Sequence, residues 1–130
     1  MKILIVDDDP TTRKLLGLFL RSRGYEVSYA ENGIDGLEKL GMETPNMIIS
    51  DLNMPYMDGI EFVKSVRSDP ARAELPILMV TTEGDPEERE RALAVGVNGY
   101  LVKPVTAEVV IQHIRHILKN MFAQGGGSHA

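Results

Sequence analysis

Apolar residues along this chain gather first in four short, uninterrupted runs. Runs of this length that are rich in isoleucine, valine and leucine are typical of strands buried on both faces of a parallel sheet. Ligands of such sheets bind at the carboxyl ends of the strands. Because each run is followed by residues that can contact a phosphate or its metal ion, we expect the function at that edge. The runs are residues 3–6, 47–50, 77–80 and 100–102, and they lead into Asp7 with Asp8, Asp51, Thr81 and Lys103.

Helical periodicity fills the segments between these runs, and residues 26–30 alternate like one more strand. Each predicted helix starts at a residue that can cap it, and Asp58 has Glu61 three residues later as a capping pair. Residues 69–76 are predicted to form a loop. The expected caps are Asp9, Asn32, Asp58, Asp85 and Thr106, and the first, second and fourth helices are expected to end near Gly24, Gly41 and Gly96.

The alternation of five strands with five helices predicts the α/β class, as a doubly wound (βα)5 three-layer sandwich. In the last helix the apolar stripe is formed by Val110, Ile114, Ile117, Leu118 and Met121. Residues 1–122 are therefore expected to form one domain. Residues 123–130, with three consecutive glycines, have the composition of a flexible tail, which is either a linker or an expression scar.

Composition narrows the class of function. The net charge of −5 argues against a nucleic-acid surface, which needs clustered lysine and arginine. The chain has no cysteine, so disulfides and thiolate metal sites are excluded. Neither a signal peptide nor an apolar run of the roughly 20 residues that span a bilayer is visible. We therefore expect a cytoplasmic protein that binds neither nucleic acid nor membrane.

The residues at the predicted edge form a set suited to phosphoryl transfer. Asp7, Asp8 and Asp51 would repel one another unless a cation lay among them, and oxygen ligands without histidine or cysteine suit Mg²⁺. A carboxylate can itself attack phosphorus. A lysine and a hydroxyl, here Lys103 and Thr81, can then stabilise the phosphoryl oxygens.

Five segments at these positions resemble one known family, the receiver domains of two-component response regulators, and its chemotaxis receivers in particular. The resemblance covers residues 1–122 and implies a flavodoxin-like fold with strand order 2-1-3-4-5. The segments are Val6-Asp7-Asp8, Ser50-Asp51-Leu52-Asn53-Met54-Pro55, Met57-Asp58-Gly59, Val80-Thr81-Thr82 and Val102-Lys103-Pro104.

The resemblance implies a role for each residue of the edge. Asp51 would be the phosphoacceptor. Asp8 would bind Mg²⁺ directly, Asp7 directly or through water, and Asn53 through its backbone carbonyl, with Asp51 as a further ligand. Thr81 and Lys103 would contact the phosphoryl group.

Four further features follow from the same resemblance. The Lys103–Pro104 peptide bond would be cis. Tyr100 would act with Thr81 as a conformational switch. Asn53 and Glu83 would tune hydrolysis of the phosphorylated form.

The resemblance also implies partners. The phosphodonor would be a histidine kinase or a phosphotransfer protein, and the output a protein that binds the face of the fourth helix, fifth strand and fifth helix. Phosphorylation would favour a homodimer. Such a domain would catalyse its own phosphorylation and dephosphorylation, which leaves its classification as an enzyme open.

Other classes fit parts of the pattern. Residues 7–11 satisfy the D-x-D-x-T motif of haloacid-dehalogenase-like phosphatases, with Asp7 as nucleophile and Asp9 as acid and base, but this leaves Asp51 without a role. A flavodoxin needs a phosphate loop after the first strand, where this chain is acidic. A receiver that acts only as a docking module would not need the complete acceptor set.

Overall fold

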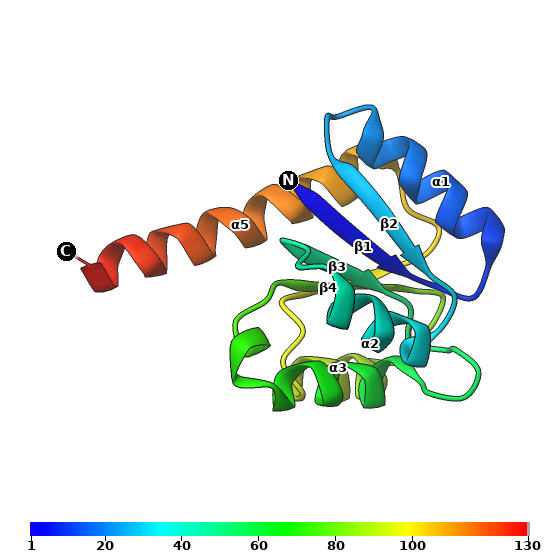
Figure 1. The fold of residues 1–130 in the computed structure, drawn as a ribbon. Helices are drawn as coiled ribbons and strands as arrows, with labels where there is room; N and C mark the ends of the chain where they lie inside the picture. The colour runs from blue at the N-terminus through cyan, green and yellow to red at the C-terminus, as the bar shows by residue number, and fades with distance from the viewer. Residues whose placement is uncertain (130) are drawn as a thin grey trace.

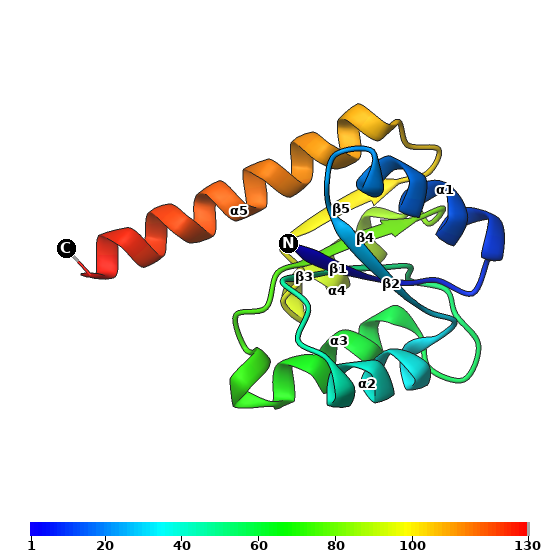
Figure 2. The same ribbon diagram turned by 45° about the horizontal axis from the view of Figure 1, so that its top comes forward.

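The fold is a parallel sheet between two layers of helices (Figures 1 and 2). The structure is a computed structural model, which describes the backbone of residues 1–129 and the side chains of residues 1–121. Within these residues the sheet has five strands in the order β2-β1-β3-β4-β5, all parallel. This is the predicted fold class and strand order. The strands are β1 (Lys2–Val6), β2 (Glu26–Ala30), β3 (Met47–Ser50), β4 (Ile77–Thr81) and β5 (Gly99–Val102).

The helices divide unequally between the two faces of the sheet. Helices α1 (Pro10–Arg21) and α5 (Ala107–His129) cover one face, and α2 (Gly33–Met42), α3 (Gly59–Ser68) and α4 (Pro86–Ala94) cover the other, as Figure 2 shows. Successive residues of one strand point to opposite faces, so Leu4 packs with Phe62 under α2 and α3, whereas Ile5 packs with Ile114 under α5. The sheet therefore separates two hydrophobic cores.

Capping residues begin the helices where the sequence predicts. The Asp58 side chain accepts from the Glu61 amide at 2.9 Å, and the Glu61 side chain accepts from the Asp58 amide at 3.3 Å, so the capping box is confirmed. Helices α1, α2 and α4 are capped by Asp9, Asn32 and Asp85. The side chain of each accepts a hydrogen bond from a backbone amide in the first turn of its helix. These caps satisfy amide groups that have no partner within the helix, and they fix where the chain turns after each strand.

Two segments differ from the regular pattern that the sequence predicts. The loop predicted at residues 69–76 contains a single 3₁₀ turn, Pro70–Arg72, capped by the Asp69 side chain. Helix α5 continues to His129 and so passes through the glycine-rich segment for which composition predicts a flexible tail. Residue 130 lies outside the described residues. The division of the chain at residue 122 stays a prediction.

Candidate functional site: the carboxyl edge of the sheet

Backbone hydrogen bonds extend the sheet one residue beyond three of its strands. The Asp51 amide donates to the Val6 carbonyl at 2.9 Å, and the Lys103 amide donates to the Thr81 carbonyl at 2.7 Å. The Asp7 amide donates to the carbonyl of Ala30 at the end of β2. Backbone hydrogen bonds alone thus hold Asp7, Asp51 and Lys103 at the carboxyl edge.

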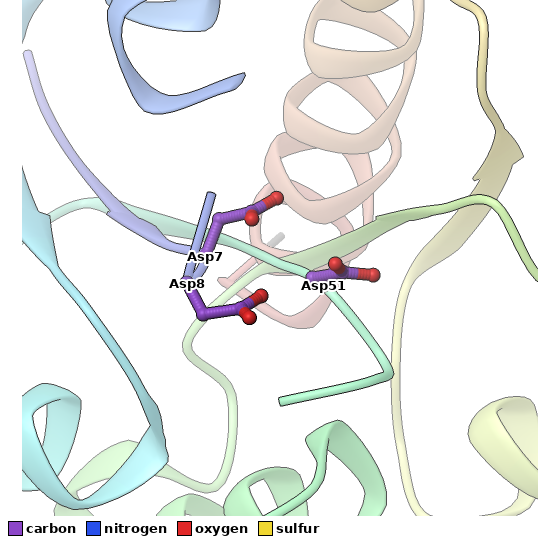
Figure 3. A group of neighbouring side chains, drawn as sticks. All are labelled: Asp7, Asp8 and Asp51. Atoms are coloured by element: carbon purple, nitrogen blue, oxygen red, sulfur yellow. The ribbon is translucent and has the colours of Figure 1, made fainter. Parts of the chain in front are cut away.

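The three carboxylates of this edge form one cluster. Figure 3 shows Asp7 and Asp8 at the end of β1, with their side chains directed toward Asp51 beyond β3. One oxygen from each residue lies within 4.8 Å of the others. Asp7 is 2% exposed and Asp51 is 8% exposed, whereas Asp8 is open to solvent. The cluster therefore has two members fixed by packing and one that meets water.

Lys103 lies between the two buried carboxylates. Its Nζ is 3.0 Å from Oδ2 of Asp7 and 3.5 Å from Oδ2 of Asp51. From the sequence, we expected this lysine to face Asp51 and contact its phosphoryl group, but we did not predict the contact with Asp7. In the structure it already supplies part of the positive charge that the three acids require.

Burial and pairing shift the pKa values of this pair. Burial is the main cause that raises the pKa of Asp7 above its ordinary value, and the Asp9 amide and Lys103 oppose it by stabilising the charged form. For Lys103, burial by itself would lower the pKa. The hydrogen bond to Asp7 and the negative charges of Asp51 and Asp7 together outweigh burial and raise the pKa. The lysine is therefore a permanent cation at neutral pH.

Asp51 is held in place by the loop that follows it. Its Oδ1 accepts from the Leu52 amide at 2.7 Å, which leaves Oδ2 as the oxygen nearer Lys103. Gly59, the first residue of α3, packs directly against this loop. A Cβ atom at residue 59 would lie 2.4 Å from the Asp51 carbonyl oxygen and 2.7 Å from Cα of Leu52. Only glycine permits this approach of α3 to the site.

Thr81, Glu83 and Tyr100 form a second group along β4 and β5. Thr81 is fully buried, and its Oγ1 accepts from the Glu83 amide at 3.2 Å. The Tyr100 side chain is 9% exposed, and its hydroxyl donates to the Glu83 carbonyl at 2.7 Å. Burial and the nearby negative charge of Glu83 raise the pKa of Tyr100, so the hydroxyl keeps its proton. One loop thus links the predicted switch residues.

The remaining site residues lie at the outer rim. Asn53 is exposed in the loop after β3, and Glu83 is half-buried in the loop after β4. The peptide bond between Lys103 and Pro104 is cis, in agreement with the resemblance.

Asp9 does not join the acidic cluster. Its side chain accepts from the Thr11 amide and the Thr12 hydroxyl, as a helix cap does. The hydrogen bond from Thr12 is the main cause that lowers the pKa of Asp9 below its ordinary value. In a phosphatase with Asp7 as the nucleophile, the residue that acts as acid and base would have to face the acidic cluster. Asp9 does not face it, which argues against this alternative.

Arg13 and Gly59 contact the site, but we did not predict these contacts from the sequence. Nη1 of Arg13 donates to the Asp7 carbonyl at 2.6 Å. Arg13 lies one turn inside α1, and long side chains on a helix reach back toward its N-terminus, so its position was a usable signal. Gly59 follows Asp58 in a matched segment, but its close approach depends on how α3 packs.

Comparison with known proteins places the chain in a family. A family model described as response regulator receiver domain matches residues 3–115. The chain belongs to this family. The receiver domain is 44% identical over 120 residues to chemotaxis protein CheY1 of Helicobacter pylori, across 91% of this chain and 97% of that protein. It is 39% identical over 127 residues to a chemotaxis protein CheY homolog of Campylobacter jejuni, across 96% and 98%.

A solved structure shares the fold of this receiver domain closely. Chemotaxis protein CheY4 of Vibrio cholerae superposes with a TM-score of 0.85 at 41% identity, covering 89% of this chain and 97% of that one. The family and the chemotaxis-receiver likeness predicted from five short segments are thus confirmed. Among the described residues, no helix is long and apolar enough to cross a membrane.

Proposed function

We propose that this receiver domain takes a phosphoryl group from a phosphohistidine donor onto Asp51 and signals the change to a protein partner. The observation that carries the proposal is the environment of Asp51. It is nearly buried, its Oδ1 is held by the Leu52 amide, and its Oδ2 faces Lys103. Asp7 and Asp8 supply separate carboxylates beside it, so Asp51 remains available as a nucleophile.

The transfer needs little beyond positioning and charge. An oxygen of Asp51 forms the new bond to phosphorus while the bond to the donor's imidazole nitrogen breaks, and that nitrogen keeps the electron pair. Lys103 is within reach of the charge that moves onto Asp51. The hydroxyl of Thr81 is the hydrogen-bond donor on the neighbouring strand.

The donor set of the acidic cluster fits Mg²⁺. Three carboxylate oxygens within 4.8 Å of one another, without histidine or cysteine, are hard ligands. Asp7, Asp8 and Asp51 would hold the ion together with the backbone carbonyl of Asn53. Bound Mg²⁺ would neutralise negative charge on the phosphoryl oxygens and on the cluster.

Phosphorylation would change the partners of Lys103 and Thr81. A phosphoryl group on Asp51 competes with Asp7 for Lys103, and it offers acceptors to the Thr81 hydroxyl. Because Thr81 and Tyr100 both contact Glu83, movement of the hydroxyl reaches the tyrosine through one loop. A shift from 1:99 to 99:1 needs about 5.5 kcal/mol of differential binding, so two new contacts give a partial shift that a partner completes.

The partner would bind the face formed by α4, β5 and α5. Leu93 of α4 is 38% exposed and Val102 of β5 is 46% exposed, beside the buried ring of Tyr100. These apolar groups support a protein partner, or a second phosphorylated copy of the chain. We also propose that Asn53 and Glu83 set the rate of hydrolysis. The cytoplasm is the expected location, where a histidine kinase or phosphotransfer protein is the donor.

The deciding experiment is intact mass spectrometry after treatment with acetyl phosphate and Mg²⁺, followed by mapping of the acid-labile adduct. Asp51→Asn should abolish the adduct, whereas Asp9→Asn, a change at the cap of α1, should leave it. An adduct on Asp7 would replace this proposal with the phosphatase reaction. If the wild-type chain forms no adduct, the remaining interpretation is a receiver that acts only as a docking module.

A second substitution tests the switch separately from the chemistry. Lys103→Ala should leave the adduct detectable and uncouple it from the change near Tyr100, because Lys103 is the cation shared by Asp7 and Asp51. The signals of Tyr100 in NMR spectra before and after phosphorylation measure the coupling. Unchanged coupling would remove Lys103 from the switch.

A further inference from the structure

Helix α1 carries a concentration of positive charge, of which only Arg13 contacts the phosphoacceptor site. The protein has a net charge of −5, yet α1 contains three basic residues and no acidic one. Arg13, Lys14 and Arg21 line a single cleft of about 310 Å³ with Pro10 and Tyr29. Among the described residues, no carboxylate forms an ion pair with any of these three cations. The cleft therefore attracts anions.

The cleft also contains a flat aromatic wall. Tyr29 lies on β2, the edge strand beside α1 in Figure 1, and its side chain is half-buried. The Arg21 guanidinium carbon lies 5.5 Å from the centre of the Tyr29 ring, within the range of a cation–π contact. Arg21 thus lies over a face of the ring, and its planar guanidinium is the surface on which another planar group can stack.

Gly17 allows the tyrosine to occupy this position. A Cβ at residue 17 would lie 2.1 Å from the Tyr29 hydroxyl oxygen, so any other residue would have to displace the ring. Glycine inside a helix is unfavourable relative to alanine. Here it lets the ring of Tyr29 lie directly against α1, at the wall of the cleft.

The opposite side of α1 has a different character. There, Leu15 lines a cavity of about 240 Å³ with Phe19, Pro104 and Val105, beside Lys103. Lys103 lines both this cavity and the phosphoacceptor site. The basic cleft has no aliphatic leucine, isoleucine or valine side chain in its wall. The two sides of the helix thus differ in charge, because three cations line the cleft and one lines the cavity.

We propose that the basic cleft is a second ligand site, which binds a phosphate-bearing nucleotide. Arg13 and Lys14 would hold the phosphate, and the base would stack on the guanidinium of Arg21, which the Tyr29 ring supports. The cleft volume is at the lower end of the range for small-molecule sites, and because the cleft is shallow and largely open to solvent, a bound ligand would stay partly exposed. Nη1 of Arg13 donates to the Asp7 backbone carbonyl and not to a carboxylate, so the cleft adjoins the acidic cluster without sharing a carboxylate with it. This site is separate from Asp51 and goes beyond the proposed phosphotransfer.

Binding of adenosine monophosphate, measured by isothermal titration calorimetry, tests the proposal. EDTA is included so that no metal ion can bridge the nucleotide to the acidic cluster. We expect saturable binding with a dissociation constant below about 1 mM. Ribose 5-phosphate has the same phosphate without the base and should bind at least about tenfold more weakly.

Matched variants locate the nucleotide. Arg21→Gln and Tyr29→Leu should each weaken binding about tenfold, whereas Tyr29→Phe, which keeps the ring, should bind like the wild type. Lys64→Gln removes the same charge from an exposed position on α3 and should have no effect. Asp51→Asn should also leave binding intact. Thermal unfolding verifies that each variant is folded.

Several results would overturn the proposal. They are an absence of binding, equal affinity for ribose 5-phosphate, equal weakening by Lys64→Gln, and loss of binding in Asp51→Asn. Binding of poly-glutamate without binding of the nucleotide would make the cleft a surface for an acidic protein segment. Each of these outcomes is independent of whether acetyl phosphate modifies Asp51.

Discussion

The carboxyl edge of the sheet has two halves that differ in their contact with water. We define the inner half as Asp7, Asp51, Thr81 and Lys103, and the outer half as Asp8, Asn53 and Glu83. The inner carboxylates and Thr81 are at most 8% exposed, whereas Asp8 and Asn53 are open to solvent. The groups proposed to make and stabilise the phosphoryl bond are thus fixed by packing. The outer residues, which are proposed to bind the metal ion and to control the access of water, lie nearer the solvent.

Gly59→Ala should disrupt the inner half most strongly. The added Cβ would meet the backbone of Asp51 and Leu52, which cannot rotate away as a side chain could. We expect a loss of roughly 2–3 kcal/mol in the free energy of unfolding, together with slower phosphorylation of Asp51. Urea denaturation measures the first effect and mass spectrometry the second.

Gly41→Ala is the matched control for this substitution. Gly41 lies in α2, and a Cβ there would have open space around it. It should be neutral or stabilise the protein by up to about 1 kcal/mol. Similar stability of the two alanine variants would show that the packing of Gly59 does not constrain the site.

Substitutions confined to the outer half should change the lifetime of the adduct and not its formation. Replacing Asn53 and Glu83 together by alanine should shift the decay rate about tenfold, which is about 1.4 kcal/mol in barrier height. Neither side chain is needed for attack by Asp51. Decay of the adduct is followed by mass spectrometry in the wild type and the double variant. Identical decay rates would show that neither residue affects hydrolysis of the adduct.

Neutralising one acid tests how strongly the three carboxylates of the two halves repel one another without metal. Asp51→Asn leaves the Lys103–Asp7 pair intact and should raise the melting temperature of the metal-free protein by roughly 3–5 °C, about 1 kcal/mol. Asp8→Asn should give a smaller rise because water screens the exposed carboxylate.

Metal affinity provides the second measurement of the same variants. Both substitutions should weaken Mg²⁺ binding in a calorimetric titration. Glu90→Gln, at an exposed position on α4, serves as the control and should change neither quantity. A lower melting temperature with unchanged Mg²⁺ affinity would contradict the acidic cluster.

Titration distinguishes two aspartates that are only two residues apart. Burial raises the pKa of Asp7, whereas the hydrogen bond from Thr12 lowers the pKa of Asp9. The stability that Asp9 contributes is present above the unfolded pKa of about 3.9 and is lost as pH falls through its lower folded pKa. The charge of buried Asp7 costs stability above its raised folded pKa, and that cost is relieved as pH falls toward about 3.9.

Carboxyl carbon chemical shifts in NMR spectra report both values. We expect the metal-free protein to give a higher pKa for Asp7 than for Asp9. The reverse order would show that Asp7 is better solvated than the structure indicates.

The sequence predicted those parts of the fold that local patterns determine. Apolar runs located the strands, and the Asp58–Glu61 spacing located a helix start that the structure confirms to the residue. The 3₁₀ turn at Pro70–Arg72 left no periodic signal because it is only three residues long. The glycines after residue 124 led us to predict a flexible tail from composition. Composition alone does not consider that the preceding helix can continue through these residues.

The candidate site was predictable in its members but not in its contacts. Asp7, Asp51 and Lys103 could be placed at one edge because parallel strands align their carboxyl ends. Their pairing depends on side-chain reach, so the Lys103–Asp7 contact was not foreseen. The contact of Arg13 with the Asp7 carbonyl and the approach of Gly59 to Asp51 depend on how α1 and α3 pack, which no local pattern encodes.

The sheet that separates the two cores has a consequence for how this protein can change. Leu4 and Ile5 are neighbours in sequence but pack in different clusters, so a cavity made in one core leaves the other core intact. Stability losses from Phe62→Leu and Ile114→Val should therefore add within about 0.5 kcal/mol, as a double-mutant cycle would measure. Both losses are nevertheless subtracted from the single free energy of unfolding of the domain, so substitutions on the two faces draw on the same reserve of stability. A stabilising substitution on one face can therefore offset a loss on the other, without contacting the cavity that caused it.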